Sequence, residues 1–305
     1  MGATPEMGAG RTISIARFCN VLATMALALA GVSAAPREGR AAAWTQPAGQ
    51  GIVIIQEDRW SGTHGFNDSH DLFRFPNNGE SYVNQTNVYV EYGLTNKLTL
   101  LGNFWLNQVG YDNDFGKTEN FGFGDQEFGA RYKMRPLGFL NGPWVGSSQL
   151  LIGVPTYRVH NVSQPLGVGG VAVELRHAIG RPYLLFGHWS YIDLSGGIRF
   201  RTGRGADELR FDAAHGTLLW GGFTLMEEFS QIQTLDNGVA FNVGNPISST
   251  NFDLTKMRFS LLKRLGPVSI QAGYERDLAG RNTGSGGGPF VGIWIPFGGS
   301  GHWAP

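Results

Sequence analysis

The sequence predicts an all-β fold, an antiparallel transmembrane β-barrel of about 12 strands that follows a cleaved N-terminal signal peptide. Three observations favour it. Stretches of about ten residues alternate between charged and apolar side chains. No apolar run after the signal approaches the ~18 residues of a membrane helix. Glycine is abundant, at 46 residues, and 12% of the chain is aromatic, which suits tilted strands with aromatic girdles.

The clearest alternation lies between residues 125 and 134. Side chains of a strand point alternately to its two faces. One face here carries Asp125, Glu127, Arg131 and Lys133, and the other carries Phe128, Ala130, Tyr132 and Met134. A wall between water and lipid needs this pattern. A strand of a secreted soluble sandwich seldom sustains it over ten residues, although that fold remains the alternative.

The first residues have the organisation of a secretory signal. Arg11 and Arg17 precede the apolar run 21–32, which is too short to span a bilayer as a helix. Small residues at 32–34 predict cleavage after Ala34, and 41–43 offers a second site. The predicted organisation is a signal peptide over 1–34 (to 43 at the latest), a barrel over 44–297 and a short tail over 298–305. Sec-type export to a Gram-negative outer membrane follows from it.

Composition excludes several classes of function. The formal net charge is zero, so no nucleic-acid partner is expected. The single cysteine, Cys19, lies in the predicted signal, so the mature chain offers no disulfide or thiolate site. The seven histidines show no metal-ligand spacing. We therefore expect no cofactor, no metal and no enzymatic activity. A lipid-modifying enzyme with a Ser–His pair on its outer wall is the less favoured alternative, because His215 is predicted to face outward with no adjacent outward serine.

Twelve strands can be assigned, an even number as in single-chain bacterial barrels. They span residues 50–59, 83–94, 97–108, 121–134, 145–155, 168–178, 190–202, 206–215, 219–233, 249–264, 268–278 and 287–297. Short turns at 94–97 and 265–267 alternate with longer polar loops at 60–82, 109–120, 156–167 and 234–248. The connections 179–189 and 203–205 fit this alternation less well. The glycine run 284–288 is predicted to be a flexible external loop.

Two strands break the alternation. Phe252 and Leu254 share a face with Lys256 and Arg258, which predicts a β-bulge near Thr255. Glu227 and Glu228 are adjacent, so one of them must point away from the charged face unless a second bulge or a strand end intervenes.

Collecting the charged faces gives a set of residues that we expect to line the lumen. Acids and bases are nearly balanced in it, which favours ion pairs across neighbouring strands over a pore of one sign. The alternative is that part of the set, with Tyr89, Asn103 and Trp105, lines a path for small solutes; the charges around the 202–205 turn are the best candidates for a constriction. The candidate lining residues are Glu91, Asp125, Glu127, Arg131, Lys133, Glu174, Arg176, Asp193, Arg199, Arg201, Glu208, Arg210, Asp212 and Glu275.

The tryptophans lie near predicted strand ends. Trp is enriched at membrane–water interfaces, because its ring is apolar and its N–H is polar. The sequence therefore predicts an aromatic girdle formed by Trp60, Trp144, Trp189, Trp220 and Trp294.

Several segments resemble a bacterial outer-membrane family named for the MetA pathway of phenol degradation. They are 43–51, 91–100, 123–132, 174–181 and 205–210, so the resemblance extends over most of the mature chain. The resemblance implies an outer-membrane barrel that transports hydrophobic or aromatic compounds. It supplies no binding residues. One departure is the tail 298–305 after Phe297, because barrel assembly usually reads a C-terminal aromatic residue.

These observations lead to one expectation about function. We expect a passive channel for small, hydrophobic or aromatic solutes, surrounded by outer-membrane lipid. The alternative is a closed structural barrel whose external loops bind a ligand or partner. The sequence names no solute and fixes no oligomeric state.

Overall fold

A computed structural model describes residues 42–135, 142–158, 162–203, 205–238 and 249–299. The predicted signal peptide over 1–34 and the last residues of the tail lie outside these ranges. Among the described residues, no helix is long and apolar enough to cross a membrane.

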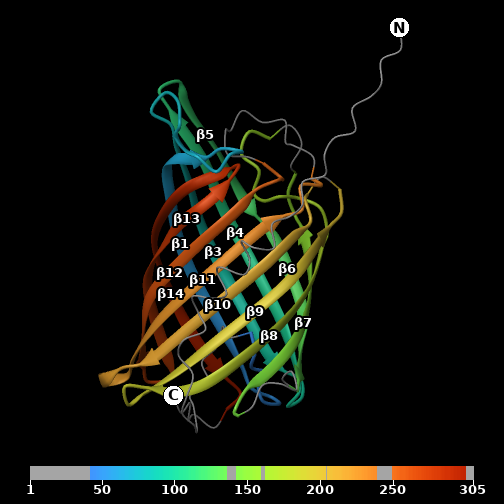
Figure 1. Cartoon of the computed structure of the whole chain (residues 1–305), viewed down its shortest axis with the longest axis vertical. Coiled ribbons are helices and arrows are strands. Elements are labelled where there is room, and N and C mark those ends of the chain that lie inside the picture. The colour runs from blue at the N-terminus through green and yellow to red at the C-terminus, as the bar shows by residue number, and fades with distance from the viewer. Residues whose placement is uncertain (1–41, 136–141, 159–161, 204, 239–248, 300–305) are drawn as a thin grey trace.

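The described chain is almost entirely strand (Figure 1). The strands are β1 (Gly51–Phe66), β2 (Leu72–Arg74), β3 (Glu80–Gly93), β4 (Leu98–Asn113), β5 (Gly116–Phe123), β6 (Asp125–Met134), β7 (Val145–Pro155), β8 (Ala172–Leu185), β9 (His188–Arg201), β10 (Glu208–Leu218), β11 (Phe223–Thr234), β12 (Asp253–Leu265), β13 (Val268–Arg281) and β14 (Thr283–Phe297). A short 3₁₀ turn, η1 (Trp220–Gly222), precedes β11.

Antiparallel pairing of neighbours closes the sheet into a barrel, because β14 pairs with β1 from Gly51 opposite Phe297 to Phe66 opposite Thr283. β5 and β6 both pair with β4 and are separated only by Gly124, so they form one long strand. β2 is a three-residue addition to β1. With β5 and β6 taken together and β2 set aside, the wall has twelve strands, which confirms the predicted fold class.

The strand bounds correct two predicted connections. The predicted eleven-residue connection 179–189 is instead a two-residue turn, Phe186–Gly187, because β8 and β9 extend further than expected and Leu185 pairs with His188. The glycine run 284–288 is not a loop: it lies in β14 and is buried against β1 and β13. Glycines are needed there because a Cβ on Gly288 would lie 1.6 Å from the Arg59 carbonyl oxygen.

The structure accounts for both breaks in the predicted alternation of side chains. The pairing of β12 with β13 does shift between Thr255 and Lys256, but the extra residue is Leu278 of β13. Glu227 and Glu228 need no bulge, since the pairing of β11 is unbroken there on both sides. Glu227 points outward and accepts a bond from His215, whose Nδ1 is 2.7 Å away, whereas Glu228 points inward towards Arg258.

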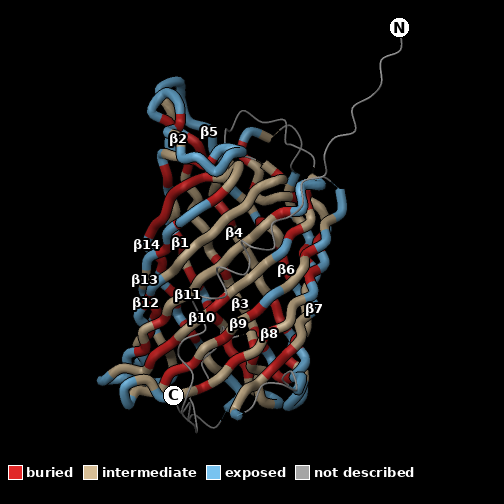
Figure 2. Tube along the Cα trace, viewed as in Figure 1, coloured by how far each residue is buried: buried red, intermediate tan, exposed pale blue. Residues whose placement is uncertain are grey.

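Buried and exposed residues alternate along many of the strands (Figure 2). The wall has an apolar outer face and a largely polar inner face. Large apolar side chains are exposed on every part of the outer face, as a lipid environment requires. They include Ile55, Leu100, Phe128, Leu150, Val173, Leu209, Leu261, Ile270 and Val291. Buried polar side chains face the interior instead, and they include Gln56, Glu91, Glu127, Glu174, Arg199, Glu208 and Glu275.

The two ends of the barrel differ. β1 begins and β14 ends at the lower end in Figure 1, where tight turns such as 186–187 and 266–267 lie. The β4–β5 hairpin and the longer connections lie at the other end. Because bacterial barrels keep short turns in the periplasm and long loops outside, the lower end is the periplasmic one. The described part of the β7–β8 connection folds back on the hairpin through bonds from Asn107 and Asn120 to the carbonyl groups of Leu166 and Gln164.

Candidate functional site

A cavity of about 410 Å³ occupies the middle of the barrel. Its wall contains side chains from every strand of the barrel except β14 and the short β2 and β5. Nine of the fourteen predicted lining residues border it: Glu127, Arg131, Glu174, Arg176, Asp193, Arg199, Arg210, Asp212 and Glu275. Tyr89, Asn103 and Trp105, the predicted neutral partners, border it as well.

One chain of charges runs around the wall from β10 to β6. Arg199 donates to Glu174 at 2.7 Å and to Glu127 at 2.6 Å. Arg176 donates to the second oxygen of Glu174 at 2.8 Å and also pairs with Asp212. Glu174 is therefore held from both sides and is almost fully buried. Acids and bases alternate along this chain, so each of its charges has an opposite neighbour. The cavity wall as a whole is nearly balanced, with seven acids and six bases.

A second chain of charges lies nearer the external end. Glu208 is fully buried and accepts bonds from Arg210 at 2.7 Å and Arg201 at 2.9 Å. Arg201 continues towards Asp125, 3.6 Å away, and Asp125 accepts a bond from the hydroxyl of Tyr157 at 2.7 Å. Of the charges predicted to form a constriction, Glu208 pairs with both Arg201 and Arg210, whereas Arg199 and Asp212 pair with charges of the first chain. This is the arrangement expected of wall-stiffening ion pairs.

The opposite wall has its own network, which the sequence analysis did not fully identify. Arg258 donates to Asp58 at 2.8 Å and lies 3.6 Å from Glu275, while Lys256 donates to Glu275 at 3.0 Å. The guanidinium of Arg258 also stacks on Phe290, 3.9 Å from the ring centre. Asp58 was missed because Ile52 and Ile54 share its face, and their presence obscures the charged pattern in β1.

Glu91 and Lys133, two of the predicted lining residues, lie on the periplasmic side of the cavity. Glu91 lies below the cavity and accepts bonds from Arg131 at 2.8 Å, from the Tyr89 hydroxyl at 2.6 Å and from Gln46 at 2.8 Å. Lys133, by contrast, is exposed at the periplasmic end of β6, and its backbone N–H pairs with Lys97. Lys133 therefore lies at the rim of the barrel and does not line the cavity.

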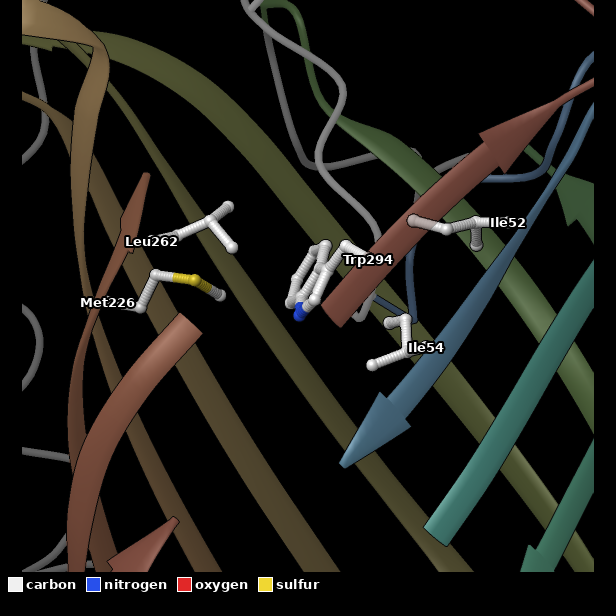
Figure 3. Close-up of a cluster of buried hydrophobic side chains, with 5 residues drawn as sticks. All are labelled: Ile52, Ile54, Met226, Leu262 and Trp294. Atoms are coloured by element: carbon white, nitrogen blue, oxygen red, sulfur yellow. The ribbon is translucent and has the colours of Figure 1, made fainter. Parts of the chain in front are cut away.

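An apolar layer lies between the cavity and the periplasmic end. It consists of Ile52, Ile54, Met226, Leu262 and Trp294, all buried and turned inward (Figure 3). Trp294 is 2% exposed, and its indole N–H donates to Gln271 at 3.0 Å. Below the layer is a separate hollow of about 60 Å³ lined by Ile52, Leu262 and Trp294 and by the turn at 266–267. The side chains of the apolar layer therefore lie between the two hollows.

The structure corrects the predicted aromatic girdle at three positions. Trp294 belongs to the apolar layer, and Trp60 points inward, where its indole N–H donates to Asp277 at 2.7 Å. Trp189 shares its face of β9 with Asp193, so it too is turned inward. Trp220 is 77% exposed at the β10–β11 turn. Trp144 precedes β7, and its ring centre lies 5.8 Å from the Arg181 guanidinium. These two remain candidates for an interfacial position.

The outer wall contains a Ser–His pair that sequence reasoning missed. Ser148 of β7 and His177 of β8 face each other on the outer side, with Oγ and Nδ1 3.1 Å apart. The pair could not be found from the sequence, because it depends on the pairing of two strands. No described carboxylate or amide orients the other ring nitrogen of His177, so the pair lacks the third group of a hydrolytic triad. Among the described residues, no group of three or more metal-ligating side chains occurs either.

The closed wall, the apolar outer face and the polar interior define a transmembrane β-barrel of the outer-membrane type. The chain is similar in fold to the solved COG4313 outer membrane channel from Pseudomonas putida F1, with a TM-score of 0.61 and 18% sequence identity over 86% of this chain and 99% of that one. The NanC porin is a more distant neighbour, with a TM-score of 0.49 and 10% identity over 80% of this chain and 98% of the porin. No family profile and no curated protein matches the sequence.

Proposed function

We propose that the protein is a passive channel for small solutes in the Gram-negative outer membrane, and that Sec-type export delivers it there. The observation that carries the proposal is the central cavity of about 410 Å³, which is lined by polar side chains along the axis of a closed barrel. A barrel that served only as a scaffold would gain nothing from a hydrated interior, since apolar packing fills small barrels equally well.

The solute class that fits best is small and aromatic, with or without a negative charge. Trp105 and Tyr89 border the cavity among arginines. Arginine binds both carboxylates and aromatic faces, and Arg258 already stacks on Phe290. The resemblance to a family named for phenol degradation agrees with this class. The proposal involves no catalytic step, no cofactor and no nucleic acid.

Liposome swelling with the refolded protein tests the proposal. Small aromatic acids and phenols are compared with sugars and amino acids of similar mass, and protein-free liposomes give the background rate. We expect the aromatic solutes to enter several times faster than sugars of equal size. Equal rates would contradict the aromatic preference, and no swelling with any solute would favour the closed barrel with binding loops.

The same preparation tests the enzyme alternative. Ser148 and His177 lie on the outer wall, away from the cavity. We therefore expect no phospholipid hydrolysis in the proteoliposomes, and unchanged swelling in Ser148→Ala. Hydrolysis that Ser148→Ala abolishes would replace the channel proposal with a lipid-modifying enzyme.

A further inference from the structure

The residues that precede β1 lie inside the barrel. This segment, Ala42–Gln50, is here termed the strap. The backbone turns at the rim, where Gly49 donates to the Gly93 carbonyl at 2.8 Å and Gln50 donates to the Pro47 carbonyl at 3.0 Å. Beyond that turn the chain runs into the lumen, and Ala43 is 1% exposed. Ala42 forms part of the lining of the central cavity.

The strap crosses half of the barrel's circumference. Its polar contacts fall on β3, β4, β6, β7 and β9, and so lead from the strand beside β1 to the far side of the barrel. The contacts are Gln46 to Glu91 of β3, Gln46 to Thr99 of β4, Arg131 of β6 to the Trp44 carbonyl, Ser147 of β7 to the Ala42 carbonyl, and Ala43 to Asp193 of β9.

The Trp44 ring fits closely against β8 and β9, and this contact surface is here termed its seat. Its ring packs edge-on against Tyr191, with the ring centres 6.0 Å apart. On another side it lies against Gly180 of β8, where a Cβ would come within 2.3 Å of the indole. Only glycine at position 180 leaves room for the ring. The wall is therefore complementary in shape to the strap.

Asp193 anchors the inner part of the strap. This carboxylate is buried, and it accepts the Ala43 N–H at 2.7 Å. No salt bridge between Asp193 and a cationic side chain is present among the described residues. A bond from a backbone N–H to a carboxylate is charge-assisted and strong for a single contact. The bond is lost once the inner end of the strap moves away from β9.

The strap and the apolar layer cover complementary parts of the lumen. The layer comes from β1, β11, β12 and β14. The strap follows the wall from β3 to β9. Between Ala42 and Ala48 the strap's described bonds to the wall all involve at least one side chain, and no ladder of backbone bonds fixes it as a strand. This part can therefore leave the wall without unpairing the sheet.

We propose that the strap is a displaceable gate, which closes the β3–β9 side of the lumen below the cavity and opens it by leaving its seat. This proposal rests on the proposed channel function. Small solutes that enter the cavity would then reach the periplasm along the wall that the strap uncovers, while the apolar layer stays closed.

Single-channel recording in planar bilayers tests the gate with the full exported chain. Trp44→Ala empties the seat, and Trp220→Ala removes an exposed tryptophan as the matched control. The double variant Gln46→Cys with Thr99→Cys is designed to fasten the strap to β4, because the backbone N–H of Gln46 donates to the Thr99 hydroxyl at 2.8 Å. Cys19 is replaced by serine in it, since it is the chain's single cysteine. Residues 44–50 stay in the mature chain whether the signal peptide is cleaved after residue 34 or after residue 43.

We expect Trp44→Ala to raise mean conductance several-fold, and Trp220→Ala to conduct as the wild type does. Reduction of the disulfide variant should raise its conductance several-fold over the oxidised form. Two results together would overturn the gate while leaving the channel proposal intact. In them, Trp44→Ala conducts no better than the wild type, and the reduced disulfide variant conducts no better than its oxidised form. If none of the proteins conducts, both proposals fail. The oxidised–reduced comparison uses one folded protein, so it decides the matter even where Trp44→Ala folds poorly.

Discussion

The charged cavity and the apolar layer lie in the same lumen, yet they are held together by different forces. In the cavity most buried charges pair with an opposite charge on another strand, as Arg199 does with Glu174 and Glu127. In the layer, Ile52, Met226 and Trp294 pack without ionic partners. The change occurs within single strands: β1 turns Ile52 and Ile54 inward near the periplasm, and Gln56 and Asp58 inward further up.

This difference predicts whether a substitution in each region affects stability or conductance. A buried ion pair that loses one partner leaves an uncompensated charge, so the cavity is sensitive to single charge deletions. An apolar constriction excludes water and ions, so the layer controls passage more than stability. Substitutions in the cavity should therefore act mainly on folding, whereas polar substitutions in the layer should act mainly on conductance.

The largest effect is expected from Arg199→Ala. It leaves Glu127 and Glu174 with one partner fewer in a buried wall, at a cost of ~3–5 kcal/mol in the free energy of unfolding. The temperature at which the folded band converts to the unfolded band on detergent gels measures it. Lys117→Ala, which breaks an exposed pair with Glu119, is the control and should leave that temperature unchanged. Equal shifts in the two variants would show that the network does not stiffen the wall.

An intermediate effect is expected from Leu262→Ser. Leu262 faces inward in the apolar layer and is 4% exposed, so a hydroxyl there introduces water into the constriction. We expect single-channel conductance to rise several-fold. Leu261→Ser changes the neighbouring, outward side chain, 47% exposed, and should leave conductance as it is. A rise in both variants, or in neither, would contradict the assignment of the layer as a barrier.

The smallest effect is expected from pH at the β4–β5 hairpin, outside the membrane. Hydrogen bonds from Lys117 and Tyr82 lower the pKa of Glu119 from 4.5 to about 2. A carboxyl with a lowered pKa stabilises the folded form above its unfolded pKa, and this contribution is lost as the pH falls from 4.5 to 2. We expect the β5 amides to exchange hydrogen faster at the lower pH, after correction for the intrinsic rate. Glu119→Gln should abolish the difference, and a difference that persists in this variant would point to another group.

Much of the barrel could be predicted because a membrane wall imposes a two-residue repeat on the sequence. All twelve predicted strands overlap observed ones, and Glu127, Arg131 and Glu174 do point inward. The repeat fails where inward side chains are apolar. Ile52 and Trp294 alternate just as lipid-facing residues would, so the pattern holds no sign of the layer. For the same reason Trp60, Trp189 and Trp294 were wrongly predicted to belong to a girdle.

The sequence alone determined the strands, their two faces and the balance of charge, because these depend on neighbours along one chain. Tertiary structure decided which charges meet, since Arg199 reaches Glu127 across 72 positions of sequence. It also decided that Ser148 faces His177 and that Ala43 of the strap meets Asp193, 150 positions further along the chain. These contacts depend on the closure of the barrel, which brings strands together at a register that no single strand encodes.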